Sequence, residues 1–186
     1  MGIPDKMSGI LFYIYKKMVT KKDCIAAEFY SAYIALVKED NLSKALKKNT
    51  AQVKKLLKKI RTKKVDYAYA EKKWTIKEIL QHLIDAERVF AYRAITFARK
   101  DTTPLPSFDE KNWAENAKVK KRKWKDLVDE FKTVRKATEK LFRSFDDEQL
   151  LSKGTASDNT INVVALGFIC AGHAAHHVKV IKQRYL

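Results

Sequence analysis

Residues that interrupt helices are scarce in this sequence. Its 186 residues include only 5 glycines and 3 prolines, and two of the prolines, Pro104 and Pro106, lie close together. Long stretches are therefore free to be helical, because helix interiors tolerate glycine and proline least. No segment shows a convincing alternation of apolar and polar residues with period two, the pattern of a half-buried strand. The sequence predicts an all-α fold.

Four segments have apolar residues spaced three, four and seven apart, which is typical of amphipathic helices. The second has the clearest start, because Thr75 and Glu78 form a capping box and Trp74 and Ile79 suit a hydrophobic staple. The predicted helices cover about residues 42–61, 75–100, 123–145 and 162–186, and a shorter amphipathic stretch precedes them at 22–37.

Polar residues and prolines mark the ends of these helices. Asp40 or Asn41 could cap the first helix, and Asn162 the fourth. The two prolines end the second helix, and a connection to about residue 122 follows. It is longer than a tight turn needs, so we expect it to cross the end of the bundle or to carry function. A second loop is predicted at 153–160.

The helices indicate how the domain is organised. Four amphipathic helices of roughly 20 residues each indicate an antiparallel four-helix bundle. The length suits one domain with a proper core, which we place at residues 22–186. Residues 1–21 are interpreted as an N-terminal extension that is either not native or poorly ordered. One alternative for residues 1–17 is that the natural start is Met18, since the polar segment after it reads like an ordinary N-terminus.

Charge and cysteine content bear on partners and compartment. The net charge of +17 could indicate an anionic partner such as nucleic acid. The lysines are spread over every segment, so we interpret them as a solvated surface. Two cysteines, Cys24 and Cys170, are too few for a disulfide framework and fit a cytoplasmic protein. The apolar run at residues 10–15 is too short to span a bilayer. Neither nucleic acid nor a membrane is expected as a partner.

The four histidines are the candidate functional residues. His173 and His177 are four apart, so a helix presents both on one face, and this face is the apolar one. His176 points to the side. His82 also faces inward, on the second predicted helix. A lone inward histidine is more often a satisfied core residue, but three such rings are costly to bury without partners. A shared metal ion would satisfy them and leave an open position.

Several segments together resemble the DinB-like superfamily. They are residues 74–88, 90–94, 103–109, 154–157 and 172–177, and the resemblance covers about residues 22–186. It implies a four-helix bundle with an unusual connection order. It also implies that a divalent metal ion, usually zinc or nickel, is bound by His82, His173 and His177. His176 matches a position that is not normally a ligand.

The resemblance also suggests a reaction. Characterised members include transferases of low-molecular-weight thiols, which use bacillithiol or mycothiol, and a mycothiol-dependent maleylpyruvate isomerase. We therefore expect a metal-dependent thiol S-transferase that adds a small thiol to an electrophilic substrate. The alternatives are a metal-dependent hydrolase and a non-catalytic stress-response protein in which the metal staples the bundle. A homodimer formed through an exposed helix face is a further expectation, and no catalytic residue is assigned.

Other residues near the predicted site keep two interpretations each. Asp85 could orient a ligand histidine or act as a base, or it could pair with Arg88. Arg93 could bind an anionic group of the substrate or pair with a carboxylate. Cys170 could approach the metal, although a small core residue is the more usual role. The aromatic side chains of Phe108 and Trp113 could line a pocket mouth or pack against the end of the bundle.

Overall fold

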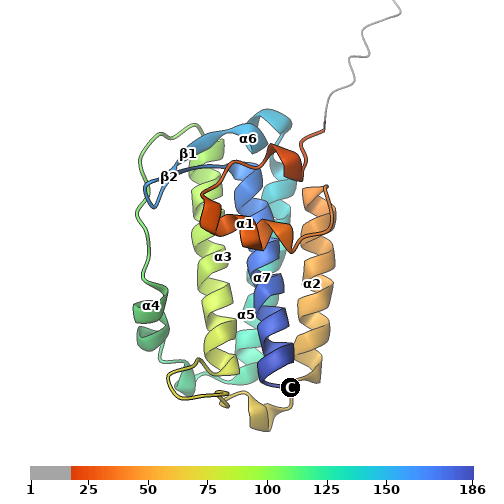
Figure 1. Ribbon diagram of the computed structural model, residues 1–186, viewed down its shortest axis with the longest axis vertical. Coiled ribbons are helices and arrows are strands. Elements are labelled where there is room, and N and C mark those ends of the chain that lie inside the picture. The colour runs from red at the N-terminus through yellow and green to blue at the C-terminus, as the bar shows by residue number, and fades with distance from the viewer. Residues whose placement is uncertain (1–17) are drawn as a thin grey trace, which may run out of the picture.

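Four long helices form the body of the protein in the computed structural model, which describes residues 18–186 (Figure 1). The prediction of an all-α four-helix bundle is confirmed. The C-terminal helix packs against two of the others and is buried on nearly every side over its first half. The four helices are α2 (Leu42–Lys59), α3 (Ile76–Ala98), α5 (Trp124–Ser144) and α7 (Val163–Arg184).

The helix starts follow the local sequence. Asn41 caps α2, with its side chain accepting a hydrogen bond from the backbone of Lys44. Thr75 and Glu78 form the predicted capping box of α3. Asn162 caps α7, whereas Lys123 gives α5 no side-chain cap. These ends were readable from sequence because the capping bond itself runs to the cap's own first turn.

The helices do not all alternate in direction. The beginnings of α3 and α5 lie together, where Arg122 donates a hydrogen bond to Gln81, so these two neighbours run parallel. The ends of α2 and α7 also lie together, where Lys64 donates to the Tyr185 carbonyl. The expectation of a fully antiparallel bundle is therefore wrong for two neighbouring pairs. The connection between α3 and α5 runs back along the outside of the bundle (Figure 1). Because of this return, α5 can run in the same direction as α3.

Short elements fill the connections. The long connection contains α4 (Glu110–Asn116) and the 3-10 turn η3 (Val119–Lys121), and a further turn, η2 (Thr62–Lys64), follows α2. After α5 come α6 (Asp147–Leu151) and an antiparallel hairpin of β1 (Lys153–Ala156) and β2 (Asn159–Asn162).

The predicted loop at residues 153–160 is thus mostly a hairpin. Ser157 and Asp158 form its turn with positive φ angles of 51° and 60°, a conformation that suits a two-residue hairpin loop. Each strand has only four residues, which is too few for an alternation to stand out in the sequence.

The chain before α2 lies across the bundle. It contains η1 (Lys21–Asp23) and α1 (Glu28–Ala35), and α1 crosses the front of α7 (Figure 1). Gly172 permits this crossing, because a Cβ atom there would come within 2.0 Å of the Tyr33 carbonyl oxygen. Val19, inside the predicted N-terminal extension, is buried in the core. Residues 1–17 of that prediction lie outside the described residues.

A buried ion pair ties the four long helices together. Arg135 of α5 donates from Nε and Nη2 to the Glu87 carboxylate of α3, at 2.6 to 2.9 Å. The same guanidinium donates to Asn49 of α2 at 2.8 Å and reaches the Cys170 carbonyl of α7 at 3.4 Å.

Within residues 18–186, α7 is the one helix long and apolar enough to cross a membrane, but 78% of that stretch is buried inside the protein, as in a core helix.

Candidate metal centre

Three imidazole rings meet between α3 and α7. The Nε2 atom of His173 lies 2.9 Å from Nε2 of His82 and 3.1 Å from Nε2 of His177. The nitrogens that these rings offer as ligands all lie within 4.8 Å of one another. The helical spacing of His173 and His177 places both rings on the face of α7 that meets α3, as expected from the sequence.

This cluster suits a cation better than it suits hydrogen bonding. A ring nitrogen carries either one proton or one in-plane lone pair, so Nε2 of His173 can form one good hydrogen bond and not two. A cation placed among three lone pairs would satisfy all three rings together, and imidazole nitrogen is an ordinary ligand for zinc and nickel. The three histidines therefore could hold a divalent metal ion.

Burial keeps the three rings in the form that binds metals. Burial lowers the pKa of His82 to about 4, with the nearby Glu110 carboxylate opposing this shift. Burial also lowers the pKa of His177 to about 3, and it lowers the pKa of His173 well below its ordinary value. The rings are thus neutral at physiological pH, and neutral imidazole is the metal-binding form.

Aromatic rings surround the cluster. Trp74 packs on His82 with ring centroids 4.8 Å apart, and Tyr33 of α1 contacts the edge of His173 at 5.3 Å. His176 stays outside the group of three and contacts Tyr33 at 5.5 Å. The buried Nδ1 atom of His177 has no hydrogen-bond partner among the described residues. Its ring is therefore held mainly by packing, and no carboxylate orients it.

The cluster opens into a cavity of about 420 Å³ between α1, α3 and the long connection. A row of α3 residues forms one wall of this cavity, with His82 at one end, apolar side chains in the middle and Arg93 at the other end. Of the described residues that line it, Glu110 carries the only carboxylate. The remaining lining residues are Phe29, Tyr30, Tyr33, Trp74, Ala86, Phe90, Ser107, Phe108, Ser157, His173, His176 and His177.

A second cavity borders part of the cluster. Its volume is about 730 Å³, and it shares Trp74, His176 and His177 with the first cavity. Lys72 and Lys111 are among its other lining residues. Of the three clustered histidines, His177 is therefore the one that borders both cavities.

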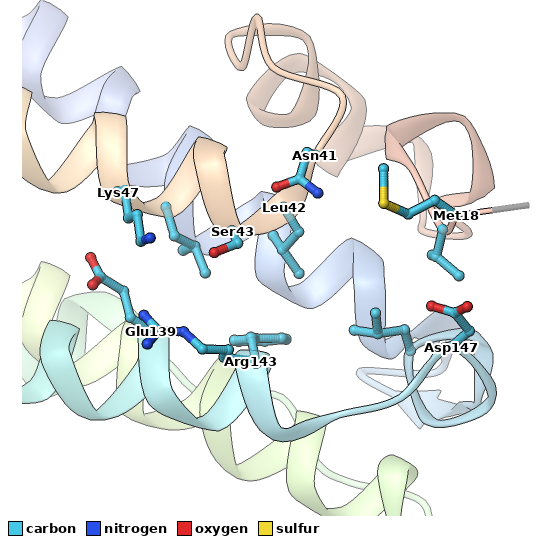
Figure 2. Close-up of a pocket in the computed structure, with 12 residues that line it drawn as sticks. Met18, Asn41, Leu42, Ser43, Lys47, Glu139, Arg143 and Asp147 are labelled. Carbon is cyan, nitrogen blue, oxygen red and sulfur yellow. The ribbon is translucent and has the colours of Figure 1, made fainter.

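A third cavity, of about 210 Å³, lies away from the histidines (Figure 2). It sits between the start of α2 and the end of α5, where Asn41, Glu139 and Arg143 line it. No histidine or cysteine is among its described lining residues. We assign it no chemistry.

The structure separates the interpretations left open for the other candidates. Asp85 accepts a hydrogen bond from Gln81 at 2.9 Å and lies 3.7 Å from Arg88, and it lines a different surface from the histidine cavity. It is therefore not placed to orient His82. Cys170 is buried in the core, outside the histidine group, and burial raises the pKa of its thiol well above the ordinary value.

The two aromatic candidates behave differently from each other. Phe108 lines the histidine cavity. The ring of Trp113 packs against the ring of Phe108, with centroids 5.0 Å apart. Trp113 remains 43% exposed and lines the surface near Asp85. Arg93 is buried and reaches the cavity without a carboxylate partner among residues 18–186.

Sequence reasoning missed several residues of the cavity wall. Tyr30 and Tyr33 come from α1, Glu110 from α4, and Ser157 from the hairpin turn. Ser157 ends one of the segments that resemble the superfamily, but Tyr30, Tyr33 and Glu110 belong to no such segment, and all four residues reach the cavity only through long-range packing of the chain. Gly172, a glycine inside a predicted helix, was a local signal of close packing, but the sequence does not show which segment packs there.

The fold and the cluster define a class: a four-helix bundle with a crossover connection and an inward-facing group of three histidines. A sequence profile of the DinB superfamily matches residues 45–181. The chain belongs to this superfamily. Among curated proteins, none matches the sequence significantly.

A solved structure shares the fold. It is described as "YfiT from Bacillus subtilis is a probable metal-dependent hydrolase with an unusual four-helix bundle topology". The two chains are 19% identical and superpose with a TM-score of 0.68. The match covers 86% of this chain and 87% of the other. The likeness supports the shared bundle topology.

Proposed function

We propose that this protein is a metal-dependent enzyme that transfers a low-molecular-weight thiol to an electrophilic substrate. His82, His173 and His177 would hold the metal ion, with zinc or nickel as the expected metals. The observation that carries the proposal is that the three ligand nitrogens converge in the wall of one cavity and that one of the three residues, His177, also lines a second cavity. A transfer reaction needs room for two reactants at one centre, whereas hydrolysis needs room for one and a water molecule.

The residues of the site have distinct roles in this proposal. A divalent ion bound there would supply Lewis acidity and would favour the thiolate form of a thiol. The neutral rings leave their lone pairs free for the ion. Trp74, Tyr33 and Phe90 give the surroundings an apolar character, which strengthens electrostatic interactions within them. In the transfer, the thiol gives its proton to solvent, a sulfur–carbon bond forms, and the leaving group departs from that carbon.

A metal-dependent hydrolase is the second candidate. It is favoured by the printed description of the YfiT structure, which names a probable metal-dependent hydrolase. The same three histidines would serve, and one cavity would hold the ester or amide substrate. A non-catalytic protein stapled by its metal is the remaining alternative. We also propose a cytoplasmic location, because the two cysteines, Cys24 and Cys170, are free.

Metal content and turnover together test the proposal. We expect about one zinc or nickel ion per chain by elemental analysis, with loss of binding in His82→Ala. His176→Ala is the matched control and should keep its metal, since this ring lies outside the group of three. If His82→Ala retains its metal content, the site assignment is wrong.

The reaction is tested with the metal-loaded protein. It is incubated with monochlorobimane and bacillithiol, mycothiol, coenzyme A or cysteine, and separately with nitrophenyl esters. Metal-dependent formation of a bimane–thiol adduct supports transfer. Ester cleavage without adduct formation supports the hydrolase. If metal removal lowers the melting temperature and neither reaction occurs, the metal has a structural role.

A further inference from the structure

Two arginines are almost fully buried, and their partners differ. Arg135, 1% exposed, forms a two-pronged ion pair with Glu87. Arg93, 2% exposed, donates from Nη2 to the Pro106 carbonyl at 2.7 Å and to the Ser157 hydroxyl at 3.0 Å. Both of these acceptors are neutral. No carboxylate of residues 18–186 pairs with Arg93, although a buried charge is normally paired.

The unpaired guanidinium lies in the wall of the histidine cavity. On α3 this wall runs from His82 through Ala86 and Phe90 to Arg93. The helical rise of about 1.5 Å per residue puts the Cα atoms of His82 and Arg93 about 16 Å apart along the axis. The cavity therefore offers metal-binding nitrogens at one end, an apolar wall in the middle and a cation at the other end.

We propose that Arg93 binds a carboxylate at the far end of an elongated substrate whose reacting atom lies at the three histidines. The inference rests on the proposed function for the reacting end, but the carboxylate site exists independently of the metal. A planar guanidinium suits a carboxylate because it offers parallel N–H donors to its two oxygens. The hydroxyl groups of Tyr30 and Ser157 line the same end of the cavity and can donate further hydrogen bonds to the anion.

Glu110 is the one competing counter-ion in the cavity wall. It opens α4, is exposed, and forms no ion pair with Arg93. Its charge acts on His82 and on Tyr30. A substrate carboxylate would bind to the buried guanidinium of Arg93, while the Glu110 carboxylate stays in contact with solvent at the cavity rim. Removing the Glu110 charge should then strengthen carboxylate binding, because one like charge leaves the cavity.

Calorimetric titration of the metal-free protein tests the inference. The probes are decanoate and decanol, which share an apolar chain and differ in charge. We expect decanoate to bind about tenfold more tightly than decanol, the effect of one charge-assisted contact. Arg93→Gln should abolish this preference, and Arg93→Lys should restore part of it. Arg88→Gln is the matched control, because it removes one exposed positive charge from the same helix and should keep the preference.

Each remaining outcome decides the question. Equal binding of the two probes to the wild-type protein overturns the inference and needs no variant. A preference that survives in Arg93→Gln, or one that Arg88→Gln loses equally, also overturns it. Ser157→Gly removes one hydrogen bond of Arg93 without its charge and should keep the preference, which separates charge recognition from the anchoring of the hairpin. Because these titrations contain no metal, a failed metal assay leaves their result readable.

Discussion

The ion pair between Glu87 and Arg135 makes a sharp prediction about stability. The guanidinium, which α5 supplies, contacts groups on the three other long helices, and its partner carboxylate is 4% exposed. Glu87→Gln keeps the shape of the side chain and removes its charge. Arg135 then stays buried without its paired carboxylate, because rotating it to water would open the core.

The magnitude follows from the burial. Removing one partner of a buried ion pair costs about 3–5 kcal/mol, because the other charge is left without compensation. The free energy of unfolding of an ordinary domain is roughly 5–15 kcal/mol. Glu87→Gln therefore removes a large fraction of the stability. Replacing both residues with methionine removes both charges, so the double variant should be less destabilised than Glu87→Gln.

Urea unfolding followed by circular dichroism measures these effects in the metal-free protein. The control is Glu148→Gln, which breaks an exposed pairing with Lys100 and should cost less than about 1 kcal/mol. The reasoning is refuted if Glu87→Gln costs no more than this control, or if the double variant is the least stable of the set.

Glu87 follows His82 on α3, and the Cys170 carbonyl precedes His173 on α7. We therefore also expect weaker metal binding in Glu87→Gln.

Three further predictions concern the site. Gly172→Ala should push α1 away from α7, since the new Cβ would lie 2.0 Å from the Tyr33 carbonyl oxygen. Faster hydrogen exchange of the α1 amides would show this displacement, and unchanged exchange would refute it. In metal-free protein the pKa of His82 is about 4 against an ordinary 6.5, so the unfolded chain binds the proton first as pH falls. Stability should then drop from neutral pH to about pH 5, by roughly 2 kcal/mol for this ring, and pH-independent urea unfolding would contradict it. Burial raises the pKa of Cys24 to about 12 and that of Cys170 well above its ordinary value, so iodoacetamide should label neither thiol in the native protein near neutral pH, whereas rapid labelling would reopen a role for them as nucleophiles.

Much of the bundle was predictable because its signals are local. The caps at Asn41, Thr75 and Asn162 bond within their own first turns, so the residue type and its position suffice. The inward direction of His173 and His177 follows from helical periodicity alone. The inward direction of His82 suggested it as the third ring, and the family resemblance then implied all three as ligands, since no local pattern connects α3 and α7.

The sequence by itself determined the four long helical segments, where most of them begin, and which faces carry the histidines. Tertiary structure alone decided that two neighbouring helix pairs run parallel, that α1 crosses α7 at Gly172, and that Glu87 pairs with Arg135 while Arg93 faces a cavity. The physical reason is the range of the interactions. Periodicity and capping act within a few residues, whereas the partner of a buried charge depends on how segments far apart in the chain pack together.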